Sequence, residues 1–181
     1  SCVQVVDVVD DFSLSSGQSN CRACGQISFS FAVEGTTSVE ANTVNLALVI
    51  DGSGSIQPTE WTQEKEFAKD VVSVFSERGL FDKGGTASYV QFDDIVVSNG
   101  TFSTQEDFDD FVDADVRDDG GTDIGAGIAE GQRLMSATDN GASGAVMIVI
   151  SDGENQDGLD AETDADIARS EGTNIFAVGV G

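Results

Sequence analysis

The chain has 181 residues, of which 33 are acidic and 8 are basic, so its formal net charge is −25. Such a surface repels nucleic acid and anionic membranes and attracts cations. No apolar run approaches the roughly 18 residues of a transmembrane helix. We therefore expect no nucleic-acid partner and no direct membrane insertion. The sequence also lacks histidine, which excludes histidine-based acid–base chemistry and histidine ligation of zinc.

The excess of acids leaves two explanations open. It could serve multivalent calcium binding or a partner with a basic patch. It could also be a surface adapted to salty water, where dissolved ions screen the self-repulsion. Because the acids are spread along the whole chain, we favour the second explanation.

Residues 1–43 are predicted to form a β-rich extension that precedes the main domain. Val3–Val9 is β-prone, and Gln26–Glu34 alternates apolar with small side chains, which is typical of a half-buried strand. The segment holds all three cysteines: Cys2, Cys21 and Cys24. We favour a disulfide that joins Cys2 to Cys21 or Cys24. A redox or zinc pair in the CRAC sequence stays open, although no βαβ pattern flanks it.

The stretch Asn45–Ile56, NLALVIDGSGSI, organises the main domain. Its apolar run Leu46–Ile50 predicts a strand buried on both faces, as in a parallel sheet. The following glycine-spaced turn presents three side-chain oxygens, from Asp51, Ser53 and Ser55. Ligands of open α/β sheets bind at this end of the strands.

The rest of the main domain, residues 44–181, alternates predicted helices and strands. A helix is expected from Pro58 to Gly79, and a tight turn at Asp93-Asp94, expected to be solvated, joins two strands. In chain order the later elements are strands at Ala87–Phe92 and Ile95–Val97, an acidic helix at Gln105–Val116, a second amphipathic helix after Thr122-Asp123, a strand at Ala145–Ile150, a helix at Ala161–Glu171 and a strand at Asn174–Gly181. Such alternation predicts a doubly wound α/β fold: a mostly parallel sheet with helices on both faces. In the acidic helix, Asp109, Asp110, Asp113 and Asp115 are expected to form a solvated face.

Three loops of this fold are predicted to bring oxygen donors to the same edge of the sheet. The donors are Asp51, Ser53, Ser55, Thr122 and Asp152. Five oxygen ligands, only two of them charged, suit a hard divalent cation such as Mg²⁺, with Mn²⁺ or Ca²⁺ as alternatives. Each residue also has an ordinary structural explanation, as a turn residue or a helix cap. Their convergence favours the metal, while Asp123 is interpreted as a helix cap or an outer group, and Glu154, Asn155 and Asp157 as a solvated loop.

Three motifs carry a family resemblance: DGSGS at Asp51–Ser55, GGTD at Gly120–Asp123 and SDG at Ser151–Gly153. Together they resemble the metal-ion-dependent adhesion site of von Willebrand factor A domains, a family that includes integrin inserted domains. The resemblance implies a Rossmann-like fold over about residues 44–181. It also implies that Ser53, Ser55 and Thr122 bind the metal directly. Asp51 and Asp152 would bind it directly or through water, and a Glu or Asp of a partner protein would fill the last position.

The resemblance indicates an extracellular adhesion or matrix-binding module, secreted or held at the cell surface or in the matrix. The alternative is an intracellular regulatory module like those that serve metal-chelatase ATPases. Phosphoryl transfer through Asp51 is disfavoured, because such enzymes need a second Asp where Ser53 stands. No Lys or Arg is expected near the three motifs to neutralise a phosphoryl group. We therefore expect no enzymatic activity.

Two further expectations concern the ends and the surface. The family's usual final helix and edge strand are not found before Gly181, so they are expected outside this sequence or replaced by the extension. An integrin-type switch of the final helix cannot be carried over.

Asn99-Gly100-Thr101 fits the N-glycosylation pattern and is expected in a surface loop.

Overall fold

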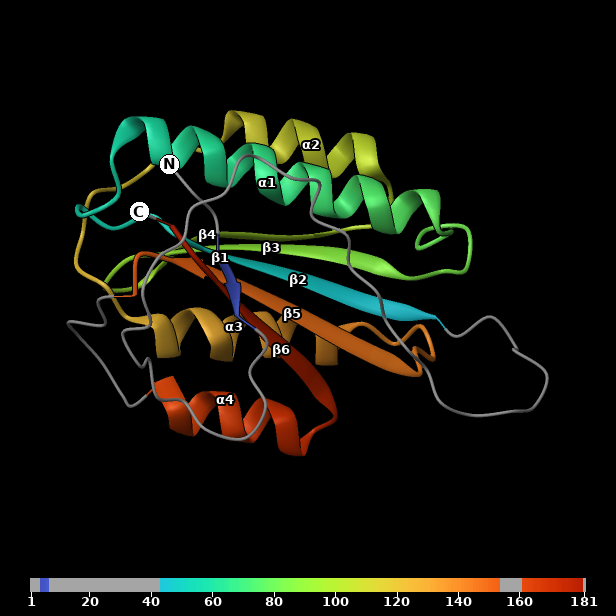
Figure 1. Cartoon of the computed structure of the whole chain (residues 1–181). Coiled ribbons are helices and arrows are strands. Elements are labelled where there is room, and N and C mark those ends of the chain that lie inside the picture. The colour runs from blue at the N-terminus through green and yellow to red at the C-terminus, as the bar shows by residue number, and fades with distance from the viewer. Residues whose placement is uncertain (1–3, 7–42, 154–160, 181) are drawn as a thin grey trace.

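A six-stranded sheet lies between two layers of helices in the computed structural model, which describes residues 4–6, 43–153 and 161–180 (Figure 1). The strands are β1 (Gln4–Val6), β2 (Val44–Asp51), β3 (Thr86–Phe92), β4 (Val96–Phe102), β5 (Gly144–Ser151) and β6 (Thr173–Gly179). The helices are α1 (Pro58–Glu77), α2 (Gln105–Ala114), α3 (Ile124–Ala137) and α4 (Ala161–Ser170). Helices α1 and α2 cover one face, and α3 and α4 cover the other. The predicted doubly wound α/β fold is confirmed.

Strand β2 lies inside the sheet and has parallel neighbours on both sides. The strand order is β1-β6-β5-β2-β3-β4, and only the two edge pairs, β1 with β6 and β3 with β4, are antiparallel. Alternate residues of β2 enter different cores: Leu46, Leu48 and Ile50 face α1 and α2, while Ala47 and Val49 face α3 and α4. All five are fully buried, as the continuous apolar run predicts for a strand covered on both faces.

Helix α3 packs closely against the sheet because two of its glycines face the strands. A Cβ on Gly127 would lie 2.6 Å from the Phe92 ring and 2.8 Å from Val49, and one on Gly131 would lie 3.0 Å from Val49. Any larger residue would push the helix away from the sheet. The close approach brings the amino end of α3, which follows Thr122, to the ends of β2 and β3.

The prediction for β4 is wrong in length. The strand continues to Phe102, so Asn99-Gly100-Thr101 lies inside an edge strand, where Asn99 pairs with Val90, and not in a loop. The polar and glycine residues suggested a loop, but an edge strand with an exposed face tolerates them. Asn99 and Thr101 are exposed.

Only a small part of the predicted extension lies within the described residues. Gln4–Val6 pairs antiparallel with β6, in register Gln4 with Gly179. The three cysteines and the strand expected at Gln26–Glu34 lie outside the described residues. The boundary at residue 43 and the disulfide therefore remain predictions.

Candidate metal centre

The loop after β2 is folded around the Asp51 side chain. Asp51 is fully buried; its Oδ1 accepts a hydrogen bond from the Ser53 amide at 2.9 Å, and its Oδ2 accepts one from Ser151 Oγ at 2.6 Å. Ser53 Oγ and Ser55 Oγ lie 3.0 Å apart. One carboxylate and two hydroxyl groups are thus gathered at the carboxyl end of β2, as predicted.

The loop that carries Thr122 is joined to this serine loop through the backbone. Gly54 donates its amide to Gly120 O at 3.0 Å, and Asp119 donates to Gly52 O at 3.2 Å. A Cβ on Gly54 would lie 3.2 Å from Asp119 O, so a larger residue would separate the loops. Thr122 is buried, 1% exposed, beside this junction.

Asp123 is a helix cap, which is one of the two roles expected for it from the sequence. Its carboxylate accepts the Ala126 amide at 2.9 Å at the start of α3. Its own amide donates to Asp93 O at 2.6 Å. Asp123 therefore fixes the position of Thr122 from both sides, through the helix and through the β3–β4 hairpin.

The solvated turn predicted at Asp93-Asp94 is half wrong. Asp94 is exposed, but Asp93 is fully buried. Asp93 Oδ1 accepts the Ile95 amide at 2.9 Å, while Oδ2 is buried without a hydrogen-bond partner among the described residues. A Cβ on Gly120 would lie only 2.3 Å from that oxygen. The turn is buried because the Thr122 loop packs onto it, an arrangement that local sequence does not reveal.

Asp152 completes the predicted set from β5. It follows Ser151, whose hydroxyl donates to Asp51, and it is half buried. The structure thus places all five predicted donors on three loops at one edge of the sheet, although the chain separates them by up to 101 positions, from Asp51 to Asp152. Glu154, Asn155 and Asp157 lie outside the described residues.

The chemistry of this donor set fits a hard cation. All the gathered groups are carboxylate or hydroxyl oxygens, which Mg²⁺, Mn²⁺ and Ca²⁺ prefer over nitrogen or sulfur. Burial raises the pKa of Asp51, against the lowering effect of hydrogen bonds from Ser151 and Ser53, and the charge of Asp152 raises it further. A bound cation would offset that burial cost, so the residues present fit a divalent metal.

The expectation that no base lies near the motifs is wrong. The Arg117 guanidinium donates to the carbonyls of Ser53, at 3.0 Å, and of Ile56. It also forms an ion pair with Asp119, whose φ of 70° makes it the only described non-glycine residue with a positive φ. Arg117 precedes the GGTD motif by three residues, but only folding brings it to the serine loop. Its donors are engaged by the backbone, so it holds the two loops together.

We predict that Arg117→Ala weakens both the fold and the metal site. The change leaves two carbonyl oxygens without their charged donor, which we expect to cost about 1.5–3 kcal/mol of unfolding free energy. Mn²⁺ affinity should fall with it, because Ser53 and Thr122 lose their common support. Urea denaturation and calorimetric Mn²⁺ titration measure the two effects. Arg169→Ala, which removes an exposed ion pair with Asp166 on α4, is the matched control and should change neither.

Asp115 also departs from its prediction as a solvated acid. Its two carboxylate oxygens accept hydrogen bonds from Tyr89 Oη at 2.7 Å and from Ser98 Oγ at 2.8 Å. Lys65 Nζ donates to its carbonyl at 2.9 Å. Burial and the Asp115 carboxylate raise the pKa of Tyr89 well above its usual value. Asp115 thereby fixes the start of the loop that leads to Arg117 and Thr122.

One buried acid near the site was not predicted from the sequence. Glu64 of α1 is 1% exposed, and within the described residues neither of its carboxyl oxygens has a hydrogen-bond partner. Burial, and then the charges of Asp51 and Asp152, raise its pKa to about 9. Its spacing from Trp61 and Ala68 put it on the apolar stripe of the helix, which was a usable signal for burial.

The chain matches the family model of the von Willebrand factor type A domain over residues 45–181, and it belongs to that family. It is 29% identical to the human collagen alpha-6(VI) chain over 78% of its length, and 30% identical to the mouse collagen alpha-4(VI) chain over 81%. In both cases it spans only 6% of the collagen chain.

The fold also matches that of proximal thread matrix protein 1 from the mussel byssus. The TM-score is 0.63 at 23% identity, over 75% of this chain and 37% of the mussel protein. A structure of the same protein with a zinc-occupied adhesion-site motif superposes with a TM-score of 0.62 at 21% identity, over the same shares of both chains. The likeness shows that the two proteins share a fold.

Proposed function

We propose that the chain is an extracellular adhesion or matrix-binding module that uses a divalent cation, Mg²⁺ in the first place, to capture an acidic residue of a partner protein. Ser53, Ser55 and Thr122 would hold the cation directly, and Asp51 and Asp152 directly or through water. The cation supplies the positive charge that binds the partner's carboxylate. The convergence of these five donors from three loops is the observation that carries the proposal.

The similarities agree with this proposal. The collagen VI chains and the mussel protein are matrix proteins, and the mussel protein has been solved with zinc at its adhesion-site motif. These similarities favour an extracellular location and protein or matrix partners, without naming them. In the described part of the chain, no helix is both long and apolar enough to cross a bilayer.

Two alternative functions have less support, and each can be told apart from adhesion. An intracellular regulatory module would keep its cysteines reduced, so thiol labelling of the natural protein distinguishes it. A phosphoryl-transfer enzyme would need a basic residue to neutralise the phosphoryl group. In the described residues Arg117 is the one basic residue near the motifs, and its guanidinium already donates to the Ser53 and Ile56 carbonyls. The absence of enzymatic activity remains a prediction.

Calorimetric titration with Mn²⁺ or Mg²⁺ tests the proposal directly. We expect one cation to bind at a site that also accepts a carboxylate. Acetate should therefore displace water from bound Mn²⁺ and lower the water-proton relaxation enhancement. Physiological salt is needed in the buffer, because a protein of net charge −25 also attracts cations unspecifically. An acetate response that persists after Asp51→Asn would contradict the proposal.

A further inference from the structure

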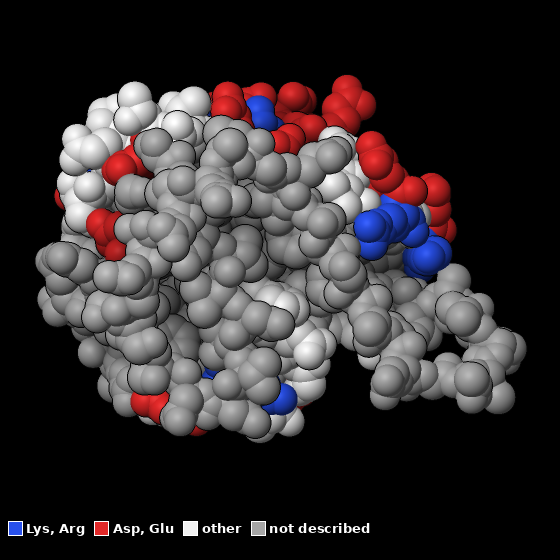
Figure 2. All heavy atoms as spheres, in the orientation of Figure 1, with Lys and Arg blue, Asp and Glu red and all other residues white. Residues whose placement is uncertain are grey.

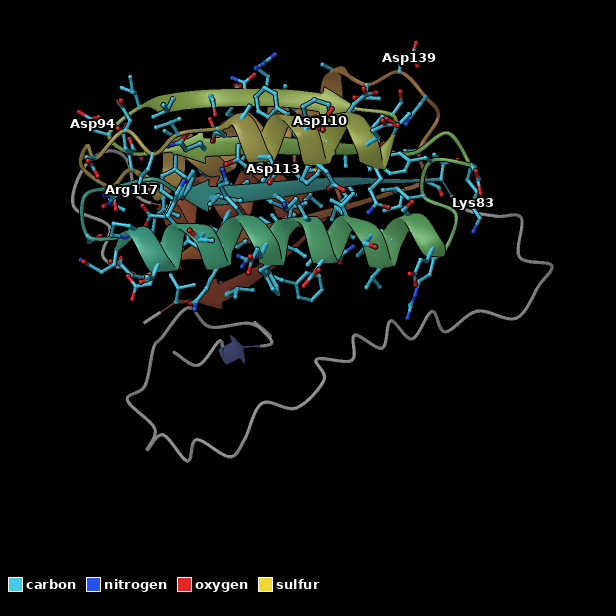
Figure 3. All side chains as sticks on the ribbon, turned by 90° about the horizontal axis from the view of Figure 1, so that it is seen from above. Lys83, Asp94, Asp110, Asp113, Arg117 and Asp139 are labelled. Carbon is cyan, nitrogen blue, oxygen red and sulfur yellow. The ribbon has the colours of Figure 1, made fainter. Side chains whose placement is uncertain are left out.

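Strand β4 forms one edge of the central sheet. It is last in the strand order, and within the described residues it pairs with β3 alone. Figure 3 shows β4 as the outer strand on that side of the sheet, beginning beside Asp94. An edge of this kind can pair with a strand from another molecule, because its outer backbone groups still form hydrogen bonds readily.

The sequence of β4 lacks the side chains that usually protect such an edge. Its residues, Val96–Phe102, include neither a charged residue nor a proline, whereas natural edge strands commonly carry one or the other to prevent pairing between copies. A β-bulge can also protect an edge. The one register shift in the pairing with β3, between Gln91 and Phe92, affects only the start of β4, and Ser98–Phe102 pairs regularly.

The charge of the rest of the surface does not replace this protection. The chain has a net charge of −25, and Figure 2 shows acids crowded over α1 and α2. Repulsion between exposed charges is screened beyond about 8 Å at physiological ionic strength, and more strongly in saltier water. Two uncharged β4 edges could therefore approach each other despite the acidity of the protein.

Asn99, the middle residue of β4, begins the only Asn-X-Ser/Thr sequence in the chain. Asn99 and Thr101 are both exposed. They lie on the same face of the sheet, because alternate residues of a strand do, and they pair with Val90 and Ser88 of β3. No side-chain hydrogen bond joins Asn99 to another described residue, so its amide nitrogen is accessible.

The Thr101 hydroxyl shows when the Asn99 amide would be modified. The glycosylation pattern requires a hydroxyl group at this position. In the folded protein Thr101 Oγ1 lies 2.9 Å from Oγ of the buried Ser88, within hydrogen-bonding distance. A transferase would therefore reach this hydroxyl before β4 has paired with β3.

We propose that Asn99 carries an N-linked glycan, and that this glycan prevents copies of the protein from pairing through β4. Asn99 Nδ2 forms a bond to C1 of an oligosaccharide donated by a polyprenyl diphosphate. The bond from C1 to the diphosphate breaks, and the amide gives up one proton as the diphosphate leaves. The attached glycan is bulky and solubilising, and from the middle of β4 it covers the strand in both directions.

The glycan would leave the metal centre open. Asn99 is three residues from Val96, where β4 begins near the Thr122 loop, which places it about 10 Å along the strand from that end. We therefore expect the same Mn²⁺ affinity with and without the glycan. The inference rests on the extracellular location in the proposed function and not on its metal.

Mass spectrometry of the natural protein tests the attachment. No Lys or Arg lies between Lys83 and Arg117, so trypsin releases Asn99 within one peptide, residues 84–117. We expect this peptide to carry a glycan. Enzymatic release of the glycan in heavy-oxygen water should leave a labelled aspartate at position 99. An unmodified peptide in the secreted protein would overturn the proposal.

Variants secreted from cultured animal cells test the protective role. Asn99→Gln removes the glycan without adding a charge, so light scattering in concentrated salt should show dimers or larger assemblies. Thr101→Ser keeps both the pattern and the hydroxyl group, and it should stay glycosylated at the mass of the wild type. Asn99→Asp also lacks the glycan but places a charge on the edge, which should prevent association.

The outcomes separate this inference from the proposed function. If Asn99→Gln keeps the wild-type mass in concentrated salt, or if Asn99→Asp associates as strongly as Asn99→Gln, the protective role is wrong. An unmodified peptide in a protein whose cysteines are oxidised would overturn the glycan alone. An unmodified peptide together with reduced cysteines would contradict the extracellular location, while Mn²⁺ titration tests the metal independently.

Discussion

Replacement of Glu64 by Gln is expected to stabilise the metal-free protein, and to do so more strongly as the pH rises. Glu64 is 1% exposed, and its carboxyl oxygens have no hydrogen-bond partner among the described residues. Its pKa of about 9 in the folded protein lies far above the ordinary value of 4.5. The folded chain therefore holds a proton that the unfolded chain releases, and the Glu64→Gln substitution would remove this difference.

The sign of the pH dependence follows from proton linkage. Between pH 4.5 and 9 the folded state binds more protons at Glu64 than the unfolded state does, so its stability falls as the pH rises. The loss is about 1.4 kcal/mol per pH unit, which amounts to roughly 4 kcal/mol between pH 5 and pH 8. Gln is neutral throughout, so the two proteins should be similar at pH 5 and diverge above it.

Urea denaturation at several pH values, with EDTA present, measures this divergence. EDTA is needed because a cation near Asp51 and Asp152 would lower the pKa of Glu64 and reduce the effect. Glu66→Gln, on the same helix but exposed, is the matched control and should run parallel to the wild type. Parallel curves for Glu64→Gln and the wild type would show that the Glu64 carboxyl is ionised in the folded protein, and would contradict this prediction.

Glu64 also bears on the charge of the metal centre. The proposed site has two ligand carboxylates, Asp51 and Asp152, whose two negative charges would balance those of a divalent cation without exceeding them. A neutral Glu64 does not change that count, whereas an ionised Glu64 would add a third charge nearby and weaken the pull on an outside carboxylate. In the proposed site, a neutral Glu64 would therefore favour binding of an outside carboxylate at neutral pH.

The sequence predicted those features that are encoded by local pattern. The apolar run Leu46–Ile50 predicted a strand covered on both faces, and β2 is that strand. The three motifs, each at the end of a predicted strand or the start of a helix, predicted that Asp51, Thr122 and Asp152 would come to one edge. The structure places Asp51 and Asp152 there because β2 and β5 are parallel and end at the same edge of the sheet, whereas metal binding by the three residues remains a prediction.

Charged groups whose surroundings come from distant parts of the chain were not predicted. Asp93 looks like an ordinary turn residue until the Thr122 loop packs onto it, and Asp115 looks like a helix-surface acid until Tyr89 and Ser98 donate to it. Arg117 reaches Ser53 across 64 positions. Because the chain is so acidic, these acids were expected to be exposed to solvent. Only Glu64 had a spacing, on the apolar stripe of its helix, that argued against exposure.

Thr122→Val is expected to weaken specific cation binding strongly while it preserves the fold. Val keeps the volume and the branching of Thr and removes only the hydroxyl group, which is one of the proposed metal ligands. Loss of a group next to a metal ligand already lowers affinity by about 10–100-fold, so loss of a ligand should lower it at least as much. Asp51→Asn should have a larger effect, because it also removes a negative charge while its amide group can still bond Ser53 and Ser151.

Calorimetric titration with Mn²⁺ at physiological salt, paired with thermal denaturation in EDTA, separates the two possible roles of these residues. A metal ligand changes affinity and leaves the EDTA melting temperature nearly constant, whereas a residue that only shapes the turn does the reverse. Thr163→Val, at an exposed position of α4, controls for the loss of a threonine hydroxyl. If Thr122→Val binds Mn²⁺ with the wild-type affinity, Thr122 is not a metal ligand, and the loop before α3 does not contribute to the metal site.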